Sequence, residues 1–243
     1  MRFSWLTILI MMTVFMMPVP SHALEFGIVD LTSGPNSIDT PTGRSDWGCR
    51  SHPIHRNPDG TPAIRFHRGI DICRGCPTGT PVGSTISGTV TRSDNSDYAG
   101  YGNRICVTNA TMRVCDSHLS TRGVSVGDTV RVGDSLGGVG STGGSTGNHI
   151  DREMYVMDPS SGRFELVDPA IAMTYAQNGF DPQDPAVGAQ ILAESQARAA
   201  ADTSCSAPAG NEGGPQGGAA GAGGSQCLPE MFSIADQLKN MYN

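Results

Sequence analysis

The first residues whose types and spacing suggest chemistry are a histidine and an aspartate four positions apart, His67 and Asp71, in the stretch HRGID. Imidazole and carboxylate groups are ordinary ligands of zinc. On a β-strand without a bulge, side chains at this spacing point to the same face. Because a glycine-punctuated, strand-like pattern follows directly, the stretch predicts part of a metal site carried on a sheet.

Further candidates lie downstream, at the edges of similar patterns. His118 stands alone, whereas His149 and Asp151 are two positions apart and share a strand face, and Glu153 follows them. A catalytic zinc keeps three protein ligands and an open position for water. It lowers the pKa of that water to about 7 and polarises a carbonyl, as amide hydrolysis near neutral pH requires. Two nearby histidines can supply a base and a donor to the developing oxyanion.

Residue types and spacing alone leave a structural alternative open. Histidines on β-strands are more often packed or surface residues than metal ligands, so these positions need independent support.

The elements that must position these residues have the pattern of antiparallel sheet. Between Gly48 and about Met157, short apolar alternations are separated by Gly, Asn and Asp. Period-two runs with frequent turn residues are typical of strands. Examples begin at Gly88, Ile105, Met112 and Val124. The fold class expected for residues 48–170 is therefore mainly β, an antiparallel sheet or sandwich.

Residues 1–23 have the composition of a secretory signal peptide. Arg2 is their only charge, and Ser21-His22-Ala23 offers a small-x-small cleavage site. The apolar run from Phe3 to Met17 is shorter than the roughly 20 residues that span a bilayer. We therefore expect cleavage and no stable membrane anchor afterwards. Residues 24–47, rich in Pro, Gly, Ser and Thr, are interpreted as an N-terminal arm.

The C-terminal third of the chain is predicted to be an extension to the β domain. Asp184-Pro185 combines a capping side chain with Pro at the first helical position, which favours a helical segment over residues 171–202. The Gly/Ala-rich residues 203–227 cannot bury enough apolar surface to order, so a disordered loop is expected.

Residues 228–243 are predicted to form an amphipathic helix. Its apolar residues recur at helical spacing, at Met231, Ile234, Leu238 and Met241. Such a helix docks either on its own domain, which is the favoured interpretation, or on a protein partner.

Charge excludes one class of partner. The chain has a formal net charge of −7 and a single lysine, Lys239. Loss of Arg2 with the signal leaves 15 Lys and Arg against 23 Asp and Glu, a charge of −8. Nucleic-acid binding depends on clustered cations, so no nucleic-acid partner is expected.

Several motifs occur in order between residues 48 and about 155. They are Gly48-Cys-Arg50-Ser-His52-Pro53-Ile54, Phe66-His67-Arg-Gly69-Ile-Asp71-Ile, Gly79-Thr-Pro-Val82, Gly88-Thr-Val90, Gly100-Tyr-Gly-Asn103, Ser117-His118-Leu119-Ser120, Val126-Gly-Asp-Thr-Val130, Gly137-Gly-Val-Gly-Ser-Thr-Gly143 and Ser145-Thr-Gly-Asn-His149-Ile-Asp151-Arg-Glu153. In this order the chain resembles the lysostaphin/LytM-type peptidoglycan zinc endopeptidases, which have the duplicated hybrid motif fold. The resemblance covers roughly half of the chain that remains after signal cleavage.

The resemblance implies roles for individual residues. His67 and Asp71 would be ligands of one zinc ion, and His118 and His149 would be the catalytic histidines. The family's His-x-His pair falls on positions 149 and 151, and its second histidine would be the third ligand. Here that position holds Asp151.

The exchange at position 151 has physical consequences. An aspartate oxygen lies as many bonds from the backbone as a histidine Nδ1, so Asp151 can hold the metal if the family's ligand binds through Nδ1. Two carboxylates would neutralise the charge of Zn²⁺ and weaken it as a Lewis acid.

Two functions therefore stay open. One is a peptidoglycan hydrolase that cuts peptide bonds of stems or cross-bridges. The other is a catalytically impaired family member that binds peptidoglycan, regulates hydrolases or serves an envelope assembly.

All seven cysteines follow the signal sequence, which indicates an oxidising compartment, either periplasmic or secreted. Seven is an odd number, so at least one has no partner within the chain. A turn at Ala110-Thr111 would place Cys106 opposite Cys115 in a disulfide.

The other cysteines offer alternatives. Cys73 and Cys76 form a CxxC motif, interpreted as a structural bridge rather than as a redox or second zinc site. The resemblance would also allow Cys49 to pair with either of them. A Cys205–Cys227 disulfide would close the Gly-rich loop.

Overall fold

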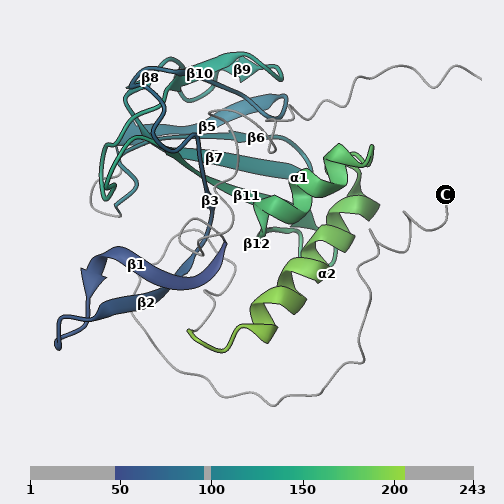
Figure 1. The fold of residues 1–243 in the computed structure, drawn as a ribbon. Helices are drawn as coiled ribbons and strands as arrows, with labels where there is room; N and C mark the ends of the chain where they lie inside the picture. Colours follow the sequence, from purple (N-terminus) through teal and green to yellow (C-terminus); the bar gives the residue numbers. More distant parts are fainter. Residues whose placement is uncertain (1–46, 96–99, 206–243) are drawn as a thin grey trace, which may run out of the picture.

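The computed structural model describes residues 47–95 and 100–205, which form twelve strands and two helices (Figure 1). The strands are β1 (Gly48–Arg56), β2 (Pro62–His67), β3 (Ile70–Ile72), β4 (Pro81–Gly83), β5 (Gly88–Asn95), β6 (Asn103–Thr108), β7 (Met112–Leu119), β8 (Thr121–Arg122), β9 (Thr129–Val130), β10 (Ser135–Gly138), β11 (Ile150–Asp158) and β12 (Arg163–Val167). The helices are α1 (Pro169–Gln177) and α2 (Pro185–Ala201).

An antiparallel sheet is the centre of the fold. Its strands are ordered β12-β11-β7-β6-β5-β9, and β3 pairs with β11 beyond the end of β12. A second sheet of three strands, β4-β10-β8, packs beside it, and β1 pairs with β2 in a hairpin that projects from the body (Figure 1). The mainly β, antiparallel fold predicted from the sequence is confirmed.

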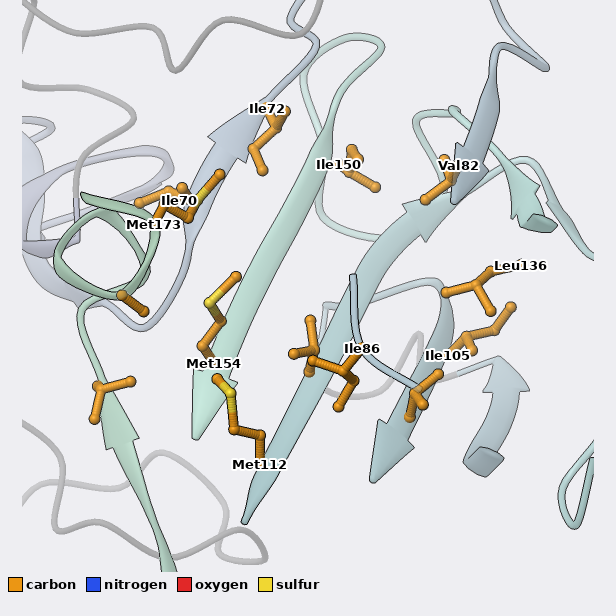
Figure 2. Close-up of a cluster of buried hydrophobic side chains, with 14 of the residues drawn as sticks. Ile70, Ile72, Val82, Ile86, Ile105, Met112, Leu136, Ile150, Met154 and Met173 are labelled. Atoms are coloured by element: carbon orange, nitrogen blue, oxygen red, sulfur yellow. The ribbon is translucent and has the colours of Figure 1, made fainter. Parts of the chain in front are cut away.

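The apolar core joins these layers. Ile70 and Ile72 of β3 lie in the same buried cluster as Met154 of β11 and Met173 of α1 (Figure 2). At the other end of the cluster, Val82 of β4 packs among residues of the main sheet. Burial of each large aliphatic side chain contributes roughly 1.5–3 kcal/mol. The core thus holds β3 against β11, where the candidate ligands lie.

Local signals explain both helices. Asp184 caps α2 by accepting a hydrogen bond from the Ala186 N–H at 2.7 Å, and Pro185 follows at the first helical position. The predicted helix start is confirmed. Asp168 caps α1 in the same way. Helix α2 packs on β11 and β12, and α1 packs on α2.

One predicted strand is wrong. Val124-Ser-Val126 alternates as a strand would, but the strand of this region is Thr121–Arg122, and Val126 is 64% exposed. Val126 lies next to a turn at Gly127, where φ is +97°.

Three disulfides are present among the described residues, Cys49–Cys205, Cys73–Cys76 and Cys106–Cys115. The Cys106–Cys115 prediction is confirmed, since the two residues are directly opposite in the β6–β7 ladder. The structural bridge between Cys73 and Cys76 is also confirmed. The Cys205–Cys227 disulfide is wrong, and so is pairing of Cys49 with the CxxC motif. The end of α2 returns to β1, which brings Cys205 to Cys49.

Other predictions lie outside the described residues. They are the signal peptide over 1–23, the arm over 24–47 except for its last residue, most of the Gly-rich loop over 203–227 and the amphipathic helix over 228–243. Among the described helices, none has the length and apolar character needed to cross a membrane.

Substitution of Asp168 tests how the helices are held. This fully buried carboxylate accepts a hydrogen bond from the Ala170 N–H at 2.8 Å and forms an ion pair with Arg198 of α2. The backbone N–H of Asp168 donates to the Ser195 hydroxyl. Asp168→Ala removes a cap and an ion pair, so the free energy of unfolding should fall by about 2–3 kcal/mol.

Asp184→Ala is the matched control for this substitution. It removes an exposed cap alone and should cost about 1 kcal/mol in urea unfolding. Equal losses in the two variants would contradict the role of the Asp168–Arg198 contact.

Candidate metal site

Three of the predicted ligands meet at one point. Asp71 of β3 is directly opposite Asp151 of β11 in the ladder, and His67 at the end of β2 reaches both. His67 Nε2 lies 3.5 Å from Asp71 Oδ1 and 3.3 Å from Asp151 Oδ1. One donor atom from each residue lies within 4.8 Å of the others. The structure therefore brings together the three residues that sequence analysis assigned to metal binding.

The geometry of His67 and Asp71 differs from the prediction that they share one strand. The chain leaves β2 after His67 and enters β3 at Ile70, so the two residues belong to different sheets. Gly69 connects the two strands at a point where a side chain has no space. A Cβ there would lie 2.1 Å from Asp151 Oδ1 and 2.6 Å from the Arg152 carbonyl oxygen. The glycine in HRGID is therefore a point of close approach to β11.

The donor set fits a divalent cation. A tetrahedral zinc with bonds of about 2.0–2.2 Å has its ligand atoms roughly 3.3–3.6 Å apart, as the two His67 contacts are. Asp71 Oδ1 and Asp151 Oδ1 are buried and have no hydrogen-bond partner within residues 47–95 and 100–205. Buried carboxylate oxygens normally have such partners, and a cation would satisfy both.

Electrostatics keep Asp151 in the form that binds a cation. Burial favours the neutral acid, but contact with His67 outweighs it and holds the pKa of Asp151 well below its usual value. Burial likewise opposes charge on His67, and the Asp151 and Asp71 carboxylates outweigh it and raise the pKa of that imidazole.

His118 and His149 lie beside the three donors, with ring centroids 4.8 Å apart. His118 Nδ1 is 2.8 Å from the Thr142 carbonyl oxygen, and His149 Nδ1 is 2.7 Å from that of Gly147. A carbonyl only accepts, so both Nδ1 atoms must donate, which leaves each Nε2 able to accept a proton. His149 Nε2 lies 3.6 Å from Asp71 Oδ1.

The backbone at His118 is held in a rarely occupied conformation. Its φ of +63° lies in the left-handed region, which residues other than glycine seldom adopt. Backbone hydrogen bonds hold it there, from the His118 N–H to Tyr101 O and from the Thr142 N–H to His118 O. Burial is the main cause that lowers the pKa of His118, which favours the neutral imidazole.

Glu153 does not join the donor group. It is buried among cations and hydroxyls: Oε2 lies 2.7 Å from Arg104 Nη2, and Oε1 accepts from the Tyr101 hydroxyl at 2.9 Å. Arg104 and Arg68 outweigh burial and lower the pKa of Glu153. Sequence reasoning missed Arg104 because no local motif marks it. Its only signal is a cation within an apolar strand pattern, Arg104-Ile-Cys-Val.

The disulfide-closed CxxC loop contacts the site from both sides. Arg74 Nη2 donates to Asp71 Oδ2 at 2.9 Å, which leaves Oδ1 directed toward His67. The Gly75 N–H donates to the Asn148 carbonyl oxygen, and the Asn148 side-chain amide donates to the Cys76 carbonyl oxygen. The loop thus links Asp71 to the residue that precedes His149.

The β domain is similar in sequence to known peptidases. Residues 65–163 match the model of Peptidase family M23. The DD-carboxypeptidase/endopeptidase Mpg of Neisseria meningitidis serogroup B is 37% identical over 110 residues, which are 45% of this chain and 23% of that protein. The peptidoglycan DD-endopeptidase ShyC of Vibrio cholerae is 32% identical over 108 residues, 44% of this chain and 23% of that protein.

A solved structure is also similar in sequence. The catalytic domain of the antimicrobial peptidase lysostaphin from Staphylococcus simulans is 31% identical over 53% of this chain and 88% of that domain, with a TM-score of 0.41. Residues 65–163 of the chain therefore form a domain of peptidase family M23. The chain spans about a quarter of the length of the curated relatives it matches.

Gly69→Ala tests the packing of the site. The added methyl group has no space between Asp151 Oδ1 and the Arg152 backbone, so β3 and β11 must separate. We expect about a tenfold or greater loss of Zn²⁺ affinity, since misplaced ligands weaken coordination. Titration with a competing zinc chromophore measures it.

Gly83→Ala is the control for Gly69→Ala. Its Cβ would meet its nearest neighbour at 3.4 Å, an ordinary contact, and it lies on β4 outside the donor group. Unchanged zinc affinity in Gly69→Ala would contradict the packing argument.

Proposed function

We propose that this protein is an exported peptidoglycan endopeptidase that uses one zinc ion to hydrolyse peptide bonds in stem or cross-bridge peptides. The observation that carries the proposal is the buried group of His67, Asp71 and Asp151 with His118 and His149 beside it. The match of residues 65–163 to peptidase family M23 and the similarity to a peptidoglycan DD-endopeptidase support the substrate class. The signal peptide proposed for residues 1–23 would deliver the chain to the periplasm or the exterior.

His67, Asp71 and Asp151 would hold the ion. When bound, zinc polarises a peptide carbonyl and lowers the pKa of water to about 7. The protein residues then have separable tasks. His118 and His149 each present an Nε2 able to accept a proton, because Nδ1 donates to a backbone carbonyl. One would take the proton of the attacking water and pass it to the amine that leaves when the C–N bond breaks. The other would take part as the imidazolium, protonated from solvent, and donate from Nε2 to the developing oxyanion.

Asp151 supports a second candidate function. With Asp71 it supplies two negative charges, which neutralise a divalent cation and reduce its power as a Lewis acid. A chain with such a site can retain peptidoglycan binding while its hydrolysis is slow, and could then act as a regulator or an assembly factor. The two functions make opposite predictions for His118 and Asp151.

His118→Ala separates catalysis from binding. Because His118 is not one of the three donors, the zinc content should stay at one ion, while peptide release from purified peptidoglycan should fall about 100-fold or more. Metal analysis and mass spectrometry of the released peptides measure the two quantities. If the zinc-loaded wild type releases no more peptide than His118→Ala does, the hydrolase proposal fails.

Asp151→His tests the second candidate. If the native protein is an impaired binder, this substitution should raise zinc affinity and create peptide release that the wild type lacks. If the native protein is a hydrolase whose metal position depends on Asp151, the longer histidine side chain should lower peptide release. Asp151→Ala should lose the metal in either case, since only His67 and Asp71 then hold it. Zinc retained by Asp151→Ala would remove Asp151 from the ligand set.

A further inference from the structure

The β1–β2 hairpin has a charge opposite to that of the chain. Residues 48–68 contain four arginines and a single acidic residue, Asp59, although the whole chain has a formal charge of −7. The same stretch contains three of the six histidines. Asp59 lies in the hairpin turn, where its carboxylate accepts hydrogen bonds from Thr61.

Two of the arginines lie directly opposite each other. Arg50 and Arg65 are cross-strand partners, two positions along the ladder from the pair of Gly48 and His67. Alternate residues of a strand face the same side, so Arg50 and Arg65 share the face of the candidate ligand His67. Like charges directly opposite in a ladder are destabilising. Asp71 compensates Arg50 in part, whereas no acidic group within residues 47–95 and 100–205 forms an ion pair with Arg65, so an anionic ligand would offset the remaining charge.

The surroundings of His52 show that the cations crowd together. Burial, and then interactions with His55, Arg50 and Arg65, lower the pKa of His52 to about 4. His52 Nδ1 accepts from the His55 N–H at 3.0 Å, so its Nε2 carries the proton. His52 is therefore a neutral donor beside two guanidinium groups.

The cationic face leads to the metal site. Arg50 Nη2 lies 3.7 Å from Asp71 Oδ2, and Arg65 is two residues from His67 along β2. Two residues of a strand span roughly 7 Å. A substrate bound in extended form beside the hairpin, with its scissile bond at the site, would place a group about two residues away against this face.

We propose that the face formed by Arg50, Arg65 and His52 binds a carboxylate of the substrate, so that the enzyme prefers peptides with a free carboxylate about two residues from the bond it cuts. The inference rests on the proposed function and deepens it by naming an acidic peptide as the substrate class. Guanidinium groups suit this task because their planar donors match the geometry of a carboxylate.

The test measures binding without turnover. Zinc-loaded His118→Ala protein is titrated with a fluorescent stem-type tetrapeptide that carries a free glutamate carboxylate, and with the same peptide carrying glutamine. We expect the acidic peptide to bind about fivefold more tightly, and the difference to shrink at high salt. With Arg65→Gln added, the preference should fall below twofold, and Arg65→Lys should retain part of it.

Arg163→Gln is the matched control. Arg163 is an exposed arginine at the start of β12, away from the hairpin, and its substitution should leave the preference unchanged. Equal affinity for the two peptides, or an undiminished preference in Arg65→Gln, would overturn the inference. Binding is measured in a variant without turnover, so a preference for the acidic peptide would be detected even if the wild type proves inactive. Conversely, absence of the preference would leave the hydrolase proposal intact.

Discussion

The site depends on two aspartates held face to face. Asp71 and Asp151 are directly opposite across the β3–β11 ladder, and both are buried. Two carboxylates in this position would repel each other strongly in a medium of low polarity, and burial alone would drive one of them to the neutral form. The surrounding residues supply positive charge instead. His67 lies against both Oδ1 atoms, and Arg74 and Arg50 lie near the outer oxygen of Asp71. The two buried carboxylates, with these neighbouring groups around them, are suited to binding a cation.

The fold explains how so short a strand can carry one of the acids. Strand β3 has only three residues, all buried, and its two isoleucines belong to the main core. Apolar packing on both sides of Asp71 fixes its backbone, and Gly69 allows the chain to approach β11 closely enough for the two acids to pair. The CxxC loop then bends away immediately after β3, with Cys73 at a φ of +61°. Burial of Ile70 and Ile72 therefore stabilises the position of Asp71, which itself contributes nothing to the apolar core.

Features that depend on neighbouring residues could be predicted from the sequence. The cap and proline at Asp184-Pro185 specify a helix start, and a short hairpin places Cys106 opposite Cys115. The grouping of His67, Asp71 and Asp151 was also predicted, but through an ordered set of motifs rather than through spacing. Spacing alone gave the wrong geometry for His67 and Asp71, because the break between their strands is imposed by β11, some 80 residues later in the sequence.

Long-range contacts were not predictable in the same way. The Cys49–Cys205 disulfide joins residues 156 positions apart, and no local pattern marks either cysteine as the partner of the other. Arg104 is similar, since its burial beside Glu153 follows from the strand order β11-β7-β6 and not from its neighbours in the sequence. In both cases the residue type is evident from the sequence, but its partner is determined by the tertiary fold.

The Cys49–Cys205 disulfide also has a consequence for the site. A two-stranded hairpin is marginally stable alone, so β1 and β2 need to be fastened to the body. The disulfide, the hydrogen bond from the Cys49 N–H to Asp202 at 3.1 Å and the burial of Trp47 in the main core do this at the base of the hairpin. Arg50 follows Cys49 directly, so the fastening fixes its guanidinium relative to Asp71. Helix α2, which supplies no residue to the metal site, thereby sets the distance between that site and the cationic face of the hairpin.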